Sequence, residues 1–458
     1  MNIFNLYLRC FIRLSIVSNI YFVNAQDWMS LNPSYLNIWS TSSIFIDSSN
    51  NKMYAGGFFS HSNNSEFNCI AVWDGNSWDS LASGIYGSPL QIGKYKGDLV
   101  ACGGFWIQPN GIDGRNFLKW TGNSWVTIGG GTNGAVQGFY EINNNLIVYG
   151  LFDSVGTIAA SKIAIWDGQN WYPFDTTIWD GYAIFDLEVY NGDIYIAGNF
   201  YNHDQSIGKL ARWDGLQWHA VDNNVMFNGL FINRLYVFNN ELYIGGYFTK
   251  SDGCPGDYLV KWDGQNLSEV GVGNINGQVM SFFEYNNELY IGGKFMTLNN
   301  GDTAANLLRW DGNSMCKFES QIIGGIWCIE LYYGNLVIGG GFYQIDSNSS
   351  ISALAIFNGI PQPDTCFSII NNVNKEVANE FKIYPNPASD KLNITFNQLD
   401  YENAVVSIVN LLGERIYSSH INDKYFTIDV SGFSDGIYLI TIRSENRFLS
   451  FRKIIVQH

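Results

Sequence analysis

The chain has 458 residues, of which 46% are hydrophobic and only 14% charged, and its formal net charge is −16. The length exceeds one ordinary core, so several domains or a repeat array are expected, and the low charge and 48 glycines exclude a disordered chain or a coiled coil. The negative charge argues against nucleic-acid binding, which needs clustered Lys and Arg.

The first 25 residues are typical of a secretory signal peptide. Arg9 and Arg13 precede the apolar run Leu14–Val23, and the sequence Val-Asn-Ala then ends at Ala25. This run is too short to span a bilayer, and no other segment of the sequence is apolar enough to cross a membrane. We therefore expect an exported protein from which residues 1–25 are removed.

Six cysteines remain beyond residue 25, and an even count in an exported protein permits disulfides. Their spacing shows no metal-binding pattern, and the sequence does not assign their pairing. Cys102 lies inside a predicted core strand, so we expect it to be a small buried hydrophobic residue. The six are Cys69, Cys102, Cys254, Cys316, Cys328 and Cys366.

Two short phrases recur along the chain at intervals of 46 to 49 residues. A period of this size indicates a propeller or a solenoid. The first phrase, such as LYIGGYF, ends in Gly with an aromatic residue two positions later, and the second, such as WDGNSW, begins with an aromatic residue. The glycines are Gly57, Gly103, Gly150, Gly198, Gly246, Gly293 and Gly340, and the second phrase begins at Trp73, Trp120, Trp166, Trp213, Trp262, Trp310 and Phe357.

Each repeat predicts four short strands, which we name A to D. Strand A is an apolar run before a turn rich in Asn, Gly and Asp, and strand B carries the first phrase. Strand C ends at the first Trp of the second phrase, and strand D begins at the Trp that follows an Asp-Gly hairpin signal. Four antiparallel strands per unit predict a propeller blade, because a solenoid would not need two tight hairpins in every repeat.

The two ends of the repeat region predict a closed ring. The last copy stops after Phe357 without a strand D, whereas the N-terminus contains an additional strand-D start at Trp28. A ring closed in this way leaves only short, protected sheet edges. The sequence thus predicts an all-β protein whose residues 26–360 form a seven-bladed β-propeller with four-stranded blades, closed by the N-terminal strand.

The Gly pair at the end of strand B, the aromatic residue after it and the Trp-bearing later strand resemble kelch or galactose-oxidase-type propellers. Cys102, Tyr149 and Ala197 replace the first Gly of the pair in three copies. The Gly-His element of WD repeats is absent from the repeats. The resemblance implies a fold, and a fold alone does not specify a function.

The C-terminal part differs in pattern. Residues 361–380 predict a linker, and the alternating strands and turn signals of residues 381–458 predict a small Ig-like β-sandwich. This stretch closely resembles the C-terminal sorting domain of the type IX secretion system of Bacteroidetes-type bacteria. The matching residues are Tyr384, Pro385, Asn386, Pro387, Gly413, Gly436, Tyr438 and Lys453. The resemblance implies export by the type IX machinery, action of its sorting protease, and a protein that is secreted or attached to the outer-membrane surface.

The repeated Trp, Asp and Gly residues are expected to build the scaffold, because the same residue at the same position of every repeat indicates packing and turn geometry. A ligand is expected on the face that carries the longer, more variable B–C and D–A loops. The candidate binding residues there are Trp106, Arg115, His61, His203, Asp204, Asp252, Asp257 and Asp302. For each of them taken alone, the sequence favours a solvated loop residue over a binding residue.

We expect a non-catalytic binding module, monomeric and without a transmembrane segment, for a glycan or a protein ligand. The alternatives are a structural or adhesive surface protein and an enzyme acting on carbohydrate. A copper-radical site needs two His ligands, two Tyr and a Cys, but the loop histidines His61 and His203 belong to different blades. No motif indicates the paired carboxylates of a glycosidase. No cofactor is expected, although the segment TKSDGCPGD could offer oxygen ligands to Ca²⁺ without matching an EF-hand loop.

Overall fold

The computed structural model describes residues 28–32, 36–61, 69–105, 115–221, 231–249, 255–271, 275–296, 306–318, 320–358, 381–396, 404–410, 415–421, 423–444 and 447–458. The predicted signal peptide (1–25) and linker (361–380) lie outside the described residues. The chain divides into two compact units, Met1–Cys366 and Phe367–His458. No helix in the described ranges is long and apolar enough to cross a membrane.

The described part of the first unit contains seven four-stranded antiparallel sheets, one for each copy of the repeat. We number these sheets blades 1 to 7 and keep the names A to D for their strands. Blade 1 is β2 (Leu36–Asp47), β3 (Lys52–His61), β4 (Ile70–Trp73) and β5 (Trp78–Ser80); blade 2 is β6 (Gly87–Tyr95), β7 (Asp98–Phe105), β8 (Phe117–Trp120) and β9 (Trp125–Thr127); blade 3 is β10 (Val136–Ile142), β11 (Asn145–Gly150), β14 (Ile163–Trp166) and β15 (Trp171–Pro173); blade 4 is β16 (Trp179–Tyr190), β17 (Asp193–Asn202), β18 (Gly208–Trp213) and β19 (Trp218–Ala220).

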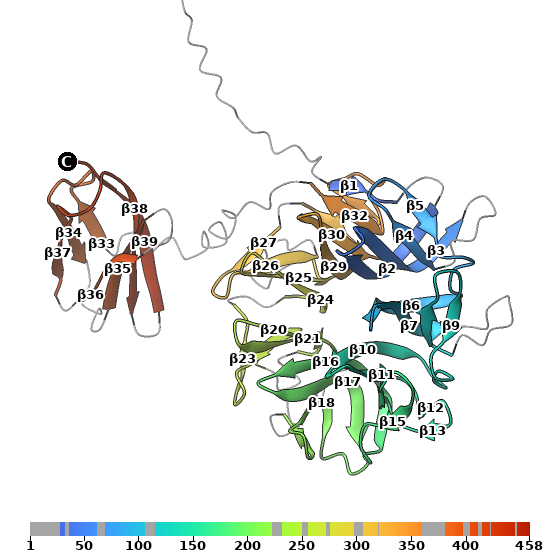
Figure 1. The fold of residues 1–458 in the computed structure, drawn as a ribbon. Helices are drawn as coiled ribbons and strands as arrows, with labels where there is room; N and C mark the ends of the chain where they lie inside the picture. Colours follow the sequence, from blue (N-terminus) through green and yellow to red (C-terminus); the bar gives the residue numbers. More distant parts are fainter. Residues whose placement is uncertain are drawn as a thin grey trace, which may run out of the picture. The chain divides into compact units, whose positions relative to one another are not determined.

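Blade 5 is β20 (Phe231–Phe238), β21 (Glu241–Tyr247), β22 (Leu259–Trp262) and β23 (Leu267–Glu269); blade 6 is β24 (Gln278–Tyr285), β25 (Glu288–Lys294), β26 (Leu307–Trp310) and β27 (Met315–Lys317); blade 7 is β29 (Ile326–Tyr332), β30 (Asn335–Gly340), β32 (Leu354–Phe357) and β1 (Trp28–Ser30). Each strand A contacts strand A of the next blade, and β29 returns to β2. The A strands therefore surround one axis in a propeller-like ring (Figure 1).

The N-terminal strand completes the sheet formed by the last repeat, as the repeat count predicts. Trp28 pairs with Phe357 across the β1–β32 ladder, and their ring centroids lie 5.0 Å apart. The Trp28 indole Nε1 donates a hydrogen bond to Ser320 Oγ at 2.9 Å, and the side chain is only 3% exposed. Residues from the two ends of the repeat region thus share one hydrogen-bonded sheet.

The first phrase is explained by a close approach between strands A and B. Every strand A of the seven blades changes register with strand B at a β-bulge, as between Pro89 and Gln91 in blade 2. Next to this bulge, a Cβ atom at Gly103 would overlap the carbonyl oxygen of Ser88, and one at Gly57 would overlap that of Ser40. The second Gly of the phrase is therefore required by the backbone of its own blade.

The second phrase is explained by turn geometry. The Asp74 carboxylate accepts the backbone N–H groups of Asn76 and Ser77, both at 2.8 Å, and Gly75 has a φ of 102°. These backbone hydrogen bonds hold the pKa of the Asp74 carboxyl below its usual value. Asp167, Asp214, Asp263 and Asp311 make the same contacts in their blades. The repeated carboxylates therefore serve as hydrogen-bond acceptors within their own hairpins.

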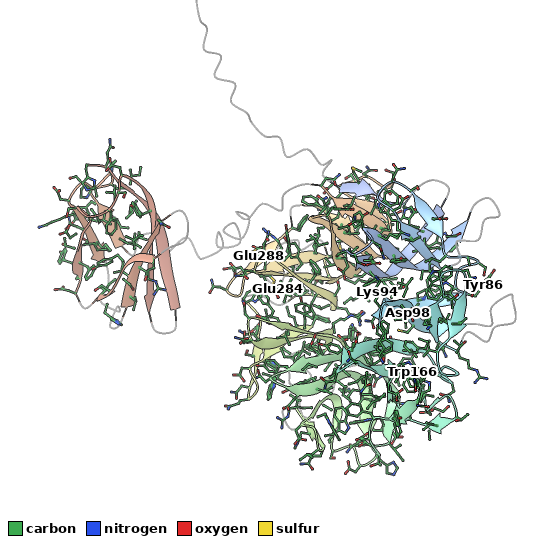
Figure 2. The ribbon with its side chains drawn as sticks, viewed as in Figure 1. Tyr86, Lys94, Asp98, Trp166, Glu284 and Glu288 are labelled. Atoms are coloured by element: carbon green, nitrogen blue, oxygen red, sulfur yellow. The ribbon has the colours of Figure 1, made fainter. Side chains whose placement is uncertain are left out.

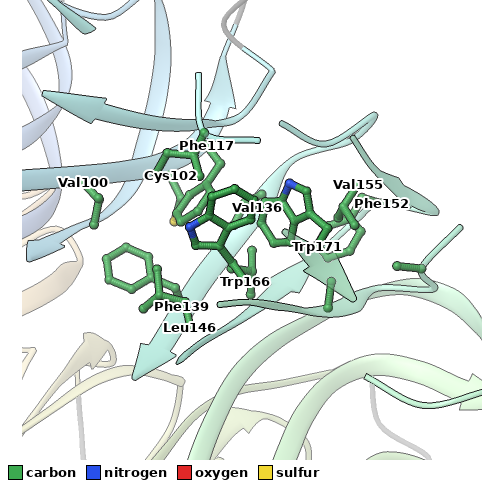
Figure 3. Close-up of a cluster of buried hydrophobic side chains, with 14 of the residues drawn as sticks. Val100, Cys102, Phe117, Val136, Phe139, Leu146, Phe152, Val155, Trp166 and Trp171 are labelled. Atoms are coloured by element: carbon green, nitrogen blue, oxygen red, sulfur yellow. The ribbon is translucent and has the colours of Figure 1, made fainter. Parts of the chain in front are cut away.

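Apolar cores lie between successive sheets. Between blades 2 and 3, Cys102 and Phe117 pack against Val136, Trp166 and Trp171 (Figure 3). Cys102 is fully buried and free, so the prediction of a small buried hydrophobic residue is confirmed. The Trp171 Nε1 donates to the Gly129 carbonyl of blade 2 at 3.0 Å, so this indole also ties two blades together.

The described cysteines fall into two groups. Cys69, Cys102 and Cys328 are free. Cys316 on β27 is disulfide-bonded.

The second unit contains two antiparallel sheets that share one core. Leu392 and Ile428 of the first sheet pack with Ile408 and Ile454 of the second. In the Tyr-Pro-Asn-Pro motif, Asn386 Oδ1 accepts a hydrogen bond from the Ile455 N–H at 2.8 Å, and Tyr384 and both prolines are exposed. The buried Tyr438 donates a hydrogen bond to the Ser434 carbonyl at 2.8 Å. Gly436 and Lys453 lie on β38 and β39, and Gly413 lies outside the described residues. The sheets are β33 (Phe381–Tyr384), β34 (Lys391–Phe396) and β37 (Tyr425–Asp429), and β36 (Arg415–Ile421), β35 (Ala404–Asn410), β38 (Gly436–Ser444) and β39 (Arg447–Val456).

Closure of the ring by β1 can be tested with Trp28→Ala. Loss of this buried indole and its hydrogen bond is expected to lower the free energy of unfolding by about 3 to 5 kcal/mol. Met29→Ala is the matched control, since Met29 lies on the same strand with 51% of its side chain exposed and is expected to change stability by about 0.5 kcal/mol or less. Chemical denaturation of both variants makes the comparison, and equal stabilities would contradict a structural role for β1.

Two adjacent glycines test the close approach of strands A and B. Gly103→Ala is expected to destabilise the fold by at least about 2 kcal/mol, because the added methyl group would overlap the Ser88 carbonyl. At Gly104 the nearest atom to an added Cβ is the Ala135 Cβ at 3.7 Å, so Gly104→Ala should be tolerated. Thermal unfolding distinguishes the two variants, and similar melting temperatures would refute the explanation of the phrase.

Candidate functional site

The bulges in the A strands create polar contacts between blades around the axis. A bulge leaves a backbone N–H without a ladder partner, and such a buried donor must find another acceptor. In three blades the acceptor is a side chain of the preceding blade. Ile92 N–H donates to Ser43 Oγ at 3.0 Å, Phe139 N–H to Gln91 Oε1 at 2.7 Å, and Leu235 N–H to Asp186 Oδ2 at 2.8 Å. Polar residues on these apolar strands therefore have a structural role.

The A strands also line a cavity of about 220 Å³ on the axis. All seven A strands contribute, together with Tyr149 of a strand B. Trp327 of β29, whose side chain is half-buried, is among the lining residues of blade 7. The described lining includes one cation and one carboxylate. Its polar residues include Gln91, Gln137, Asp186, Arg234 and Ser281.

A buried phenol and a buried carboxylate meet in the cavity wall. The Tyr149 hydroxyl donates to Asp186 Oδ1 at 3.2 Å. Gly138 of strand A pairs with Tyr149, and a Cβ there would overlap the Tyr149 hydroxyl, so the missing side chain of Gly138 leaves the space for this phenol. Burial raises the pKa of Asp186, against the opposing charge of Arg234, and raises that of Tyr149 well above its usual value. Tyr149 thus stays a neutral donor.

Two further acidic residues, Glu188 and Glu330, lie on A strands beyond the cavity, toward the A–B turns. Each follows a cavity-lining residue of its own strand by two positions. Burial raises the pKa of Glu188 and of Glu330 to about 7. The Tyr140 hydroxyl donates to Glu188 Oε1 at 3.1 Å, and the Glu284 N–H donates to the Tyr236 hydroxyl at 3.3 Å. Glu284 itself is exposed on blade 6 (Figure 2). This end of the axis carries acidic groups whose charge changes near neutral pH.

A row of aromatic rings crosses blades 4 and 5 where strand A begins and strand B ends. We call Tyr182, Phe185, Phe231, Tyr247 and Tyr258 the aromatic ladder. Successive ring centroids lie 6.0, 5.7, 6.0 and 5.8 Å apart, which is contact distance for aromatic pairs. Tyr182 is 54% exposed and Tyr247 41% exposed. The ladder therefore offers open ring surface on the face that carries the B–C and D–A loops, which we call the loop face.

Blade 1 presents aromatic surface at the corresponding position. Trp39 is 76% exposed and lies at the first bulge of β2, where Tyr182 lies in β16. Phe58 on the neighbouring β3 is also exposed. Large apolar side chains this open to solvent on a folded surface are typical of interaction sites.

The structure does not gather the binding residues that the sequence predicts. Arg115 is exposed and lines a separate pocket of about 340 Å³ between blades 2 and 3, where its Nη1 donates to the Gly130 carbonyl at 3.4 Å. Exposed His203 has Nδ1 3.3 Å from Asp180 Oδ2, and Asp204 accepts the Ser206 N–H at 3.0 Å within the same turn. His61 is the last residue of β3, and the half-buried Asp257 directly precedes Tyr258 of the aromatic ladder. The other three predicted residues, Trp106, Asp252 and Asp302, lie outside the described residues.

Sequence reasoning looked for a site in the loops and missed the charged residues of the A strands. Asp186 and Glu188 interrupt the apolar run AIFDLEVY, and Arg234 interrupts INRLYVF. Charged residues are almost never fully buried without a partner, so their presence in a core strand was the available signal. Among the described residues, no group of three or more His, Cys, Asp or Glu side chains could hold a metal ion.

Residues 382–457 match the family model of the secretion system C-terminal sorting domain. The protein is secreted or attached to the outer-membrane surface. The sorting domain also implies interaction with the type IX secretion machinery. The prediction of this domain from the Tyr-Pro-Asn-Pro motif and the strands that follow it is confirmed.

Other similarities of the chain are more distant. An endo-acting ulvan lyase of Formosa agariphila is 32% identical over 160 residues, which cover 35% of this chain and only 28% of the lyase. Among solved structures, the extracellular domain of a putative hybrid two-component system of B. thetaiotaomicron aligns with a TM-score of 0.46 and 12% identity over 92% of this chain and 57% of that chain. PorZ, a surface component of the type IX secretion system of Porphyromonas gingivalis, aligns with a TM-score of 0.37 and 11% identity over 92% of this chain and 66% of that chain.

The buried acids predict how stability depends on pH. Because the pKa values of Glu188 and Glu330 are about 7 in the folded protein and near 4.5 when unfolded, the folded state binds more protons between these pH values. The free energy of unfolding should therefore fall as pH rises from about 4.5 to 7, by roughly 3 kcal/mol at most for each group.

Denaturation at pH 5 and pH 8 makes this measurement. Glu188→Gln and Glu330→Gln should each reduce the loss of stability and raise the melting temperature at pH 8. Glu284→Gln is the control, since Glu284 is exposed and should leave the profile unchanged. If the wild-type protein is instead more stable at pH 8 than at pH 5, ionisation of the two carboxyls does not destabilise the fold, and the prediction is wrong.

Proposed function

We propose that this protein is a surface-exposed or released binding module that recognises a glycan on its loop face. The observation that carries the proposal is the aromatic ladder. Sugar rings expose C–H groups that stack on aromatic faces, and a row of partly exposed Tyr and Phe rings suits an extended chain of sugars better than a compact ligand. The exposed Trp39 on blade 1 adds a second contact surface on the same face.

The scaffold behind this function is, in our proposal, a seven-bladed β-propeller of kelch type. Its support is the ring of seven four-stranded sheets with β1 as the outer strand of the last. The boundaries would be a signal peptide at 1–25, a propeller at 26–360, a linker at 361–380 and an Ig-like sorting sandwich at 381–458, which the sorting protease removes. We propose that the protein acts as a monomer and without a metal cofactor.

A second candidate is a carbohydrate-degrading enzyme. The 32% identity to an endo-acting ulvan lyase favours it, although the match spans about a third of this chain. The cavity supports this candidate with a neutral Tyr149 hydroxyl, the Asp186 carboxylate and the Arg234 guanidinium in one wall. Incubation of the purified protein with acidic polysaccharides, followed by detection of unsaturated products, tests it directly.

The test of the binding proposal is a glycan array followed by titration calorimetry on the best hit. Tyr247→Ala and Tyr182→Ala are each expected to weaken binding by about 5- to 100-fold, because loss of one stacked ring removes about 1 to 3 kcal/mol of contact energy, as measured for other ring systems. Parallel titrations with Ca²⁺ and with EDTA should give the same affinity if no metal is required.

Tyr333→Ala is the matched control for these variants. Tyr333 is 67% exposed but lies in the A–B turn of blade 7, on the opposite face of the ring. It should bind as the wild type does. A blank array with a folded protein would reject glycan recognition and favour a protein ligand or an adhesive role. Equal losses in all three variants would place the binding surface elsewhere.

A further inference from the structure

We propose that the axial cavity is a subsite for one carboxylate-bearing sugar, a hexuronate residue of the glycan, and that Arg234 is the partner of its carboxylate. The proposal rests on the proposed glycan-binding function and names the class of glycan. The cavity of about 220 Å³ suits a single sugar residue, since pockets for larger, drug-sized ligands begin at about 300 Å³.

Arg234 supplies the charge that recognises the acid. It is the one cation among the described lining residues. Its Nη1 donates to the Asn233 carbonyl at 3.1 Å, and this is the hydrogen bond that the described part of the chain gives it. A guanidinium has five N–H donors in a planar fork that matches a carboxylate. Most of the donors of Arg234 are thus available to a ligand.

Asp186 does not occupy this guanidinium. Its carboxylate accepts the N–H groups of Leu187 and Leu235, at 3.0 and 2.8 Å, and the Tyr149 hydroxyl at 3.2 Å. These three donors come from blades 3, 4 and 5, and together they engage both carboxylate oxygens. Asp186 therefore holds the wall together. The charge of Arg234 acts on Asp186 as well as on the cavity, but the two side chains make no direct ion pair.

Other lining groups complement a sugar. The Gln137 amide makes no hydrogen bond to any described residue and lies on a bulge of β10. The Ser281 side chain is 4% exposed, and its hydroxyl has no hydrogen-bond partner in the described part of the chain. An unpaired buried hydroxyl costs free energy, and rotation about its Cα–Cβ bond turns it toward a ligand oxygen. The half-buried Trp327 gives the cavity an aromatic wall.

The cavity continues the aromatic ladder. Phe185 of the ladder immediately precedes Asp186 of the cavity wall, and Phe231 lies three residues before Arg234 on the same strand. A glycan chain stacked on Phe185 and Phe231 therefore runs past the mouth of the cavity. One of its residues can enter while its neighbours remain on the ladder.

The experiment compares matched ligands by titration calorimetry on the purified chain. The ligands are a short oligoglucuronate, its carboxyl-reduced neutral counterpart, a sulfated neutral oligosaccharide and free glucuronic acid. We expect the oligoglucuronate to bind at least about 10-fold more tightly than the neutral form, since hydrogen bonds to a charged group are the stronger kind.

Arg234→Gln should remove this preference and leave the affinity for the neutral oligosaccharide unchanged. Arg234→Lys should keep part of it, because an ammonium group retains the charge and loses the planar fork. Ser281→Ala keeps the test informative if the Arg234 variants do not fold, and should weaken acidic and neutral sugars alike by a few-fold.

Several outcomes would overturn the proposal. Equal affinity for acidic and neutral sugars, or a preference that survives Arg234→Gln in a folded protein, removes the role of Arg234. Tighter binding of the sulfated sugar assigns the cavity to a sulfate, and equal affinity for free glucuronic acid and its oligomer makes a small acid the ligand. If no sugar binds at all, the glycan-binding function itself fails together with this subsite.

Discussion

The whole ring depends on the contact between a bulge in strand A and the Gly opposite it in strand B. The bulge brings the backbone of strand A so close that any Cβ on the second Gly of the phrase would collide with a carbonyl oxygen. It also frees a backbone N–H that the neighbouring blade must satisfy, as Gln91 does for Phe139. One local irregularity thereby requires a Gly in each strand B and, in three blades, supplies a hydrogen bond to the preceding blade.

This constraint makes the axis of an otherwise apolar molecule polar. Acceptors are needed where the bulges face one another, so Ser43, Gln91 and Asp186 occupy positions that packing alone would give to hydrophobic side chains. Once polar groups are present there, a substitution at one of them changes the chemistry of the cavity without altering the ring. Tyr149, which replaces a Gly of the phrase opposite the side-chain-free Gly138, is such a change. The scaffold and the candidate site therefore share residues.

The repeat period, the strand order within each sheet and the sorting domain could be predicted from the sequence because each depends on short-range patterns. The regular recurrence of residues such as Gly57 and Trp73 along the chain is enough to predict the strands and hairpins. The bulges could not be predicted, since a single extra residue in strand A leaves no local signal. The aromatic ladder and the cavity arise from residues about one repeat apart, such as Phe185 and Phe231, which meet only when the blades are in contact. Loop residues such as His203 looked more exposed, and thus more functional, than the strand residues that line the axis.

A net charge of −16 is compatible with recognition of an acidic sugar. At physiological salt the Debye length is about 8 Å, so the acidic surface has little effect on an anion that has already reached the mouth of the cavity. Inside it, the effective dielectric constant is lower, so the nearby guanidinium of Arg234 acts strongly on an anion, and the three donors to Asp186 partly offset the negative charge of that carboxylate. The surface charge would slow association, and the cavity would determine how long the ligand stays. An acidic chain and the proposed anion-binding cavity can therefore coexist in one ring of blades.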